Sequence, residues 1–218
     1  MTTLPAALRT TLDFAARRLP LPASGAAVLL MGLATVAVAD GPPATLPDPD
    51  PACEYNEAMA LEDRASPLMS FRQTLGEGDL VLCWGAPSAR GRIMIGGEHV
   101  PFGELWRMGA NEPTVLHTEV SLSVGGVRLE PGSYALYAIP GENRWEVFIS
   151  ASTDHWGNQI NEDVRAAEVG TIEVEPGPAD GHVEILTFRL EDPGTRSATL
   201  VMEWESTRLE IPVTATGG

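Results

Sequence analysis

Residues 115–150, VLHTEVSLSVGGVRLEPGSYALYAIPGENRWEVFIS, decide the fold class of this 218-residue chain. Apolar and polar side chains alternate along three segments of this stretch, which is the period of a β-strand with one buried face. Clusters of glycine, proline and asparagine separate the segments and predict tight turns. The segments are Val115–Ser123, Ser133–Ile139 and Trp145–Ser150, and the turns are Gly125-Gly126, Pro131-Gly132 and Pro140–Asn143.

The same alternation continues on both sides, from residue 69 to residue 214. Seven further strands are predicted: Met69–Leu75, Leu80–Trp84, Val127–Leu129, Val169–Glu175, Val183–Leu190, Ala198–Trp204 and Arg208–Thr214. Ten short strands without a long amphipathic helix indicate an all-β domain, an antiparallel β-sandwich or a jelly roll. Two long irregular stretches, 85–114 and 151–166, are expected to serve function or contacts.

An uncharged apolar run, LPLPASGAAVLLMGLATVAVA, occupies residues 19–39 behind the twin arginine Arg17-Arg18. Positive charge before such a run predicts a cytoplasmic N-terminus and an exported main domain. Two interpretations stay open. Ala37-Val38-Ala39 fits a signal-peptidase site, whereas a 21-residue helix of about 31 Å matches the hydrocarbon core of a bilayer. The residues alone slightly favour cleavage, although the 18 residues before the run are long for the n-region of a signal peptide. We take the retained anchor as the working expectation.

The expected organisation has four parts along the chain. They are a cytoplasmic segment over residues 1–20, a transmembrane anchor or signal peptide over 21–39, a Pro-rich periplasmic linker over 40–67 and a periplasmic β-sandwich over 68–218. The protein would then be a single-pass protein of a bacterial inner membrane, in contact with the lipid bilayer through its N-terminal helix. With a cleaved leader it would be exported and soluble.

The chain has a formal net charge of −16, and its negative charge lies on the exported side. Residues 1–39 hold three arginines and one aspartate, a net of +2, which leaves −18 for residues 40–218. A surface this acidic argues against nucleic acid as a partner.

Two cysteines, Cys53 and Cys83, both fall on the exported side. An oxidising compartment permits one disulfide between them, which would fasten the linker to the sandwich. The alternative is a pair of free thiols, with Cys83 a small buried residue of its strand.

The densest special sequence is GRIMIGGEHVPFGELWRMGANEPT, at residues 91–114. Its glycines surround Arg92, Trp106, Arg107, Asn111 and Glu112. Together with the later runs SYALYAIPG, WEVFIS and ATLVMEWE, it resembles the signature of a bacterial family, the domain-of-unknown-function family numbered 2911. The resemblance covers about residues 66–214 and implies an exported, strand-rich domain, but no reaction.

Three roles are open for this run. In the first, Trp106 plugs the end of the sandwich while Arg107, Asn111 and Glu112 hold the loop, with Arg107 and Glu112 within reach of an ion pair. In the second, Trp106 is a platform and Arg92 or Arg107 grips a carboxylate or sugar hydroxyls. In the third, Glu112 is a catalytic carboxylate of a glycosidase, which would need a second carboxylate.

The second long stretch contains Asp154-His155-Trp156-Gly157-Asn158. If it joins the first, Trp106 and Trp156 would form an aromatic patch for sugar stacking or docking. No metal site is expected, because the four histidines lack metal-ligand spacing and His117 with Glu119 fits a solvated strand face. Ser133 and Ser150 have no local base partner, so nucleophilic catalysis is not expected.

These features predict a non-catalytic, membrane-anchored accessory subunit of a larger membrane protein complex, with a respiratory or photosynthetic assembly as a plausible host. The alternatives are a periplasmic module that binds a small molecule or carbohydrate and, third, a glycan-acting hydrolase. We expect no catalytic residue, no metal ligand and no cofactor. The candidate ligand- or partner-binding residues are Arg92, Trp106, Arg107, Asn111, Glu112, His155 and Trp156.

Overall fold

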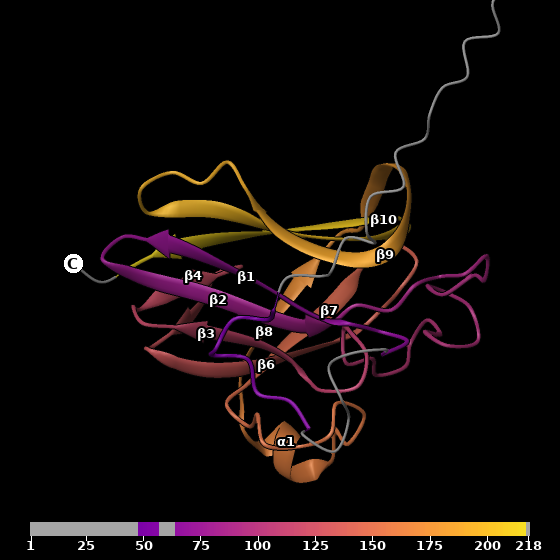
Figure 1. The fold of residues 1–218 in the computed structure, drawn as a ribbon, viewed down its shortest axis with the longest axis horizontal. Coiled ribbons are helices and arrows are strands. Elements are labelled where there is room, and N and C mark those ends of the chain that lie inside the picture. The colour runs from indigo at the N-terminus through magenta and orange to yellow at the C-terminus, as the bar shows by residue number, and fades with distance from the viewer. Residues whose placement is uncertain (1–47, 57–63, 217–218) are drawn as a thin grey trace, which may run out of the picture. The chain divides into compact units, whose positions relative to one another are not determined.

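The computed structural model of the chain describes residues 48–56 and 64–216, which form two antiparallel β-sheets lying face to face (Figure 1). The predicted cytoplasmic segment and the predicted anchor or signal peptide at 21–39 fall outside the described residues. Within the described ranges, no helix has the length and apolar character needed to cross a membrane.

The larger sheet has six strands in the order β1-β2-β3-β6-β7-β8. Their bounds are β1 Leu68–Leu75, β2 Gly78–Gly85, β3 Thr114–Thr118, β6 Gly132–Ile139, β7 Trp145–Ser150 and β8 Glu168–Val174. All neighbouring pairs are antiparallel. The predicted alternation is clearest in β3, where buried and half-buried residues follow one another strictly.

The smaller sheet has four strands in the order β5-β4-β10-β9. Their bounds are β5 Val127–Leu129, β4 Leu122–Val124, β10 Ser197–Ala215 and β9 Gly177–Glu191. The two strands predicted at 198–204 and 208–214 are one strand, β10, whose register against β9 shifts on both sides of Glu205. Such an irregularity interrupts the alternation without ending the strand, which explains the prediction of two strands.

The strand predicted at Val115–Ser123 is wrong in one respect, because the chain changes sheets in its middle. β3 ends at Thr118 and β4 begins at Leu122. The Thr118 hydroxyl donates to the Val120 carbonyl and accepts from the Val120 N–H, which closes the corner. β4 joins the other sheet, whereas β3 pairs with β6 and places His117 opposite Ser133.

The apolar core fills the space between the two sheets. Trp145 of β7 and Trp204 of β10 are almost completely buried in it. Trp106, from the first long loop, stacks on Trp204 with ring centroids 5.8 Å apart and meets Trp145 edge-on at 6.0 Å. Reciprocal backbone hydrogen bonds between Trp106 and Ala138 hold this loop against β6. Trp106 therefore belongs to the core, as the first of its three predicted roles requires.

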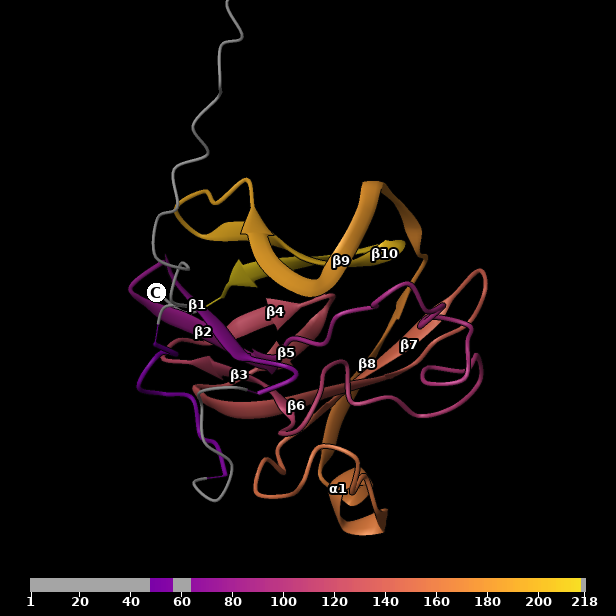
Figure 2. The same ribbon diagram turned by 45° about the vertical axis from the view of Figure 1, so that its right-hand side comes forward.

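Two long loops extend from the sandwich, and the second carries a short helix at the bottom of the view (Figure 2). The first, residues 86–113, joins β2 to β3, and the Glu205 carboxylate accepts hydrogen bonds from the Met94 and Ile95 N–H groups in it. The second, residues 151–167, contains the short helix α1 (Glu162–Ala166), which Asn161 caps by accepting from the Val164 N–H. The loops touch where the Gly157 N–H donates to the Asn111 carbonyl.

Candidate functional site

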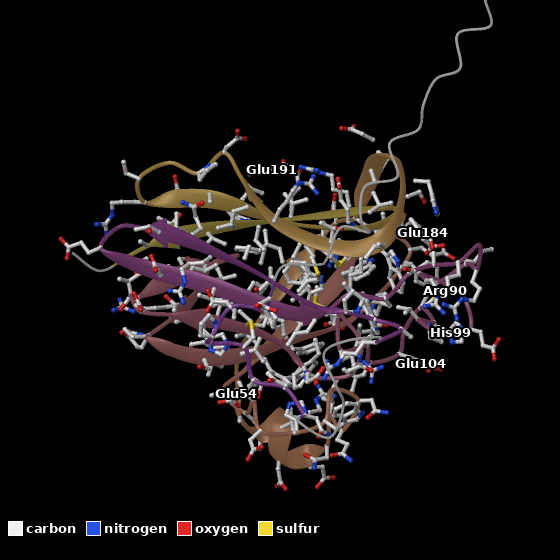
Figure 3. All side chains as sticks on the ribbon, in the orientation of Figure 1. Glu54, Arg90, His99, Glu104, Glu184 and Glu191 are labelled. Carbon is white, nitrogen blue, oxygen red and sulfur yellow. A yellow bond between two sulfur atoms is a disulfide. The ribbon has the colours of Figure 1, made fainter. Side chains whose placement is uncertain are left out.

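The candidate residues other than Asn111 line two separate cavities. The histidine cavity, of about 390 Å³, is lined by His155, Trp156 and Glu112 of the candidates and by Glu54, His117 and Ser133. The arginine cavity, of about 480 Å³, is lined by Arg92, Trp106 and Arg107 of the candidates and by His99, Asn158 and Trp204. In Figure 3, Glu54 of the first cavity lies well apart from His99 of the second. Asn111 lines neither cavity.

His117 and Ser133 face the histidine cavity from adjacent strands. They are partners in the β3–β6 register, and His117 Nδ1 lies 2.8 Å from Ser133 Oγ. The sequence gives Ser133 no local base, but the sheet supplies one from sixteen residues away. Burial lowers the pKa of His117 below its usual value, which keeps the ring neutral near pH 7.

His155 enters the same cavity from the second loop. Its Nδ1 lies 2.9 Å from the Trp156 carbonyl oxygen. A carbonyl only accepts, so Nδ1 carries the proton of the bond. In the neutral ring Nε2 is therefore unprotonated and presents a lone pair.

The Nε2 atoms of His117 and His155 share an unusual state. Both are buried, and neither has a hydrogen-bond partner. They are the only such side-chain atoms among residues 48–56 and 64–216, and both belong to residues that line the histidine cavity. Buried polar atoms in native structures are nearly always satisfied, so this pair calls for a missing partner.

The N-terminal segment before β1 builds one wall of the histidine cavity. Cys53 forms a disulfide with Cys83 of β2, so the linker is fastened to the sandwich. Three residues on, the Asn56 N–H donates to the Glu112 carboxylate at 3.1 Å. The segment thus brings Glu54 and Tyr55 to the cavity.

Glu112 forms a buried ion pair with Arg64 rather than with Arg107. The Arg64 guanidinium donates to both carboxylate oxygens, at 3.0 and 2.9 Å, and the two side chains are only 3% and 8% exposed. Arg107 instead binds the backbone, since its Nε donates to the Gly109 carbonyl at 3.2 Å. With both oxygens engaged, Glu112 supports the cavity wall.

Asn111 joins three segments of chain. Its backbone has a φ of +64°, which asparagine tolerates better than most residues. Its side-chain amide donates to the Ser66 carbonyl at 3.2 Å, and its own carbonyl accepts from Gly157. It is a positioning residue for both loops.

The aromatic patch expected from Trp106 and Trp156 is absent from the described part of the chain. Trp106 is 8% exposed and packs between Trp145 and Trp204. Trp156 is half-buried and lines the histidine cavity instead. The loops meet as expected, but each tryptophan serves a different cavity.

In the arginine cavity, Arg92 and Arg107 lie beside an indole floor. Arg92 is fixed by donation to the Ala89 and Ser88 carbonyls, and its Nη1 lies 3.2 Å from His99 Nε2. Because a guanidinium only donates, His99 accepts through Nε2. Trp106 and Trp204 supply the floor.

No group of three or more histidine, cysteine or acidic side chains placed to hold a metal ion occurs among the described residues.

Comparison with known families supports the family resemblance that the run at residues 91–114 indicates. The model of a family described as a protein of unknown function, DUF2911, matches residues 66–213. This chain belongs to the DUF2911 family. The resemblance drawn from the sequence over residues 66–214 is confirmed. Neither the curated proteins nor the solved structures that were compared with the chain gave a match.

Proposed function

We propose that the domain is a binding module whose histidine cavity holds a small ligand rich in hydroxyl groups and without negative charge, such as a saccharide. The pair of buried, unpartnered Nε2 atoms on His117 and His155 carries the proposal. Each such atom costs about 1–3 kcal/mol when it is left unsatisfied. A ligand hydroxyl at each position would remove that cost.

The lining of the histidine cavity fits hydrogen-bond donors. The carboxylates of Glu54 and Asp154 offer acceptor oxygens, and His155 offers Nε2 as an acceptor because its Nδ1 donates to the Trp156 carbonyl. No arginine is among the described residues that line it, so an anionic ligand would meet carboxylates without compensation. Tyr55 and Trp156 add aromatic surface for the apolar face of a sugar ring.

Calorimetric titration with three matched hexoses tests the proposal. Glucose and glucosamine should bind and glucuronate should bind more weakly, because only glucuronate carries a negative charge towards Glu54 and Asp154. His155→Phe keeps the ring volume but removes the acceptor, and should weaken binding about tenfold or more. His182→Phe is the matched control, since His182 is exposed and pairs with Glu184 on β9.

Two results would overturn this function. One is the absence of binding by every sugar of a broader neutral panel. The other is a His155→Phe variant that binds as tightly as the parent chain.

A second proposal is the membrane-anchored accessory subunit of a larger membrane protein complex. Its support is the apolar surface of the first loop, where Ile93 is 74% exposed, Phe102 42% and Leu105 38%. Exposed apolar side chains gathered on one loop are typical of partner contacts. The disulfide suits the periplasm, and the uncharged run at 19–39 would provide the anchor.

Native solubilisation in mild detergent tests the second proposal. The parent chain should migrate with a complex, and Ile93→Asp together with Phe102→Asp should release it. Migration of the parent chain alone, as a monomer, would contradict the accessory role. The hydrolase alternative has no comparable support, since Glu112 is engaged by Arg64.

A further inference from the structure

Arg107 is a half-buried cation that forms no salt bridge with any carboxylate among the described residues. Seven other arginines of the described chain pair with carboxylates: Arg64, Arg72, Arg128, Arg144, Arg165, Arg189 and Arg208. Arg107 makes only the bond from Nε to the Gly109 carbonyl, and its two terminal nitrogens have no hydrogen-bond partner among the described residues. Desolvation lowers the pKa of Arg107, and the charge of Glu112 opposes this only in part.

The arginine cavity is free of carboxylates. The chain contains 30 acidic residues, yet no aspartate or glutamate is among the described residues that line this cavity. Glu205 is anchored nearby, but it does not line the cavity and its carboxylate accepts from the Met94 and Ile95 N–H groups. The cavity thus concentrates positive charge in an otherwise acidic protein.

Apart from His99 and Asn158, most of the remaining lining is apolar or aromatic. Trp106 and Trp204 stack at 5.8 Å to form the floor, and Met94, Leu105 and Ile160 stand around it. This pairing of a cationic grip with an apolar surface selects ligands that carry both kinds of group.

We infer that the arginine cavity binds an organic anion, whose acidic group pairs with Arg107 beside Arg92 and whose apolar body lies against Trp106 and Trp204. A guanidinium fork with two free terminal nitrogens suits the two oxygens of a carboxylate, or of a phosphate monoester. This site is separate from the histidine cavity and opposite to it in charge, so either site can fail its test without the other.

Titration of the full chain with matched small probes tests the inference. 3-Phenylpropanoate should bind, its neutral isostere 3-phenylpropanamide should bind at least about tenfold more weakly, and phenyl phosphate shows whether the anion is a carboxylate or a phosphate ester. Arg107→Gln should weaken the binding of 3-phenylpropanoate about tenfold or more, and Arg107→Lys should keep part of the affinity that Arg107→Gln loses. Arg144→Gln is the control, because Arg144 is exposed and pairs with Glu173.

A second measurement needs no variant. In the parent chain, 3-phenylpropanoate should shift the indole N–H resonances of Trp106 and Trp204 more than that of Trp156, which lines the other cavity. Equal binding of the acid and the amide, an Arg107→Gln variant that binds like the parent, or no response of Trp106 and Trp204 to either anion would each overturn the inference.

Discussion

Trp106 and Trp156 differ in burial, and this difference assigns each of them one of the roles that the sequence leaves open. Both are aromatic residues in long loops, and the sequence places them on one patch. In the structure Trp106 contacts two core tryptophans, while Trp156 stays half-buried beside His155. The first therefore stabilises the fold and the second is free to contact a ligand.

Trp106→Ala should lower the free energy of unfolding by about 3–5 kcal/mol, because it empties the space between Trp145 and Trp204. Urea denaturation measures this loss. Trp156→Ala, the control, should lose clearly less because its ring is only partly buried. A Trp106→Ala variant that unfolds like the parent would contradict the core assignment.

Arg107→Met should cost no more than about 1 kcal/mol, the net value of its one hydrogen bond to Gly109. Removing a desolvated cation that has no carboxylate partner offsets that loss. Thermal unfolding of the parent chain and of Arg107→Met measures this difference in stability. A large loss of stability would show that Arg107 is structural rather than kept for a ligand.

The sequence could not join His117 to Ser133. Each residue is visible in a predicted strand, but their contact depends on the register between β3 and β6. The alternation read through Val115–Ser123 conceals the corner at Thr118 that sends β4 to the other sheet. No local signal reports which distant strand then lies beside β3.

Among the elements, the segment before β1 has the largest effect on the site. It is fixed by the Cys53–Cys83 disulfide and by Asp50, which accepts from Arg72 at 2.9 Å and donates its N–H to the Ser70 hydroxyl at 2.8 Å. The predicted strands are otherwise close to the observed ones, since β1, β6 and β7 differ from them by a residue or less. The alternation of a strand is a local property, so it can be predicted from the sequence. The docking of a Pro-rich segment depends on distant contacts and cannot be predicted in this way.

Replacing both Cys53 and Cys83 with serine should free this wall of the histidine cavity. The disulfide spans 30 residues, and loss of such a cross-link is expected to cost about 3–4 kcal/mol in the chain-entropy account. Sugar binding should weaken together with stability, and calorimetry with chemical denaturation measures both. Unchanged sugar affinity in the double variant would show that Glu54 and Tyr55 do not contribute to the site.

Gly157→Ala tests the junction of the two loops. A Cβ at this position would lie 2.5 Å from the Asn111 carbonyl oxygen and 2.7 Å from both Arg107 Cδ and the Glu112 carbonyl oxygen. The clash with backbone should cost about 1–3 kcal/mol. The substitution should also weaken the binding of both the sugar and the organic anion, because Glu112 lines the histidine cavity and Arg107 lines the arginine cavity. Gly181→Ala is the control, because no atom lies within 4 Å of its added Cβ and Gly181 does not have a positive φ.

At the scale of the whole molecule, acidic side chains are tied into networks that keep the strands together. Arg189 and Arg208 both pair with Glu191 and Glu203 across β9 and β10. Hydrogen bonds from Arg208 and Arg189 hold the pKa of Glu191 at about 2, well below its usual 4.5. A carboxylate whose pKa is lower in the folded state stabilises the fold above its unfolded pKa.

The melting temperature should therefore fall as the pH is lowered from about 4.5 to about 2, the interval between the unfolded and folded pKa values of Glu191. Glu191→Gln should make this fall shallower, because it removes one of the groups that must be protonated on unfolding. Glu142→Gln, at an exposed turn, is the control. Identical pH profiles for the parent and Glu191→Gln would contradict a contribution from this network.

The most direct test of the proposed ligand site is a side-chain nitrogen NMR titration of the four histidines with a neutral or amino sugar. The account predicts that the Nε2 resonances of His117 and His155 shift together as the buried atoms gain partners. His182, paired with Glu184 on the surface, and His99, beside Arg92 in the other cavity, should stay unchanged. Sugar binding that leaves both His117 and His155 unmoved would contradict the account.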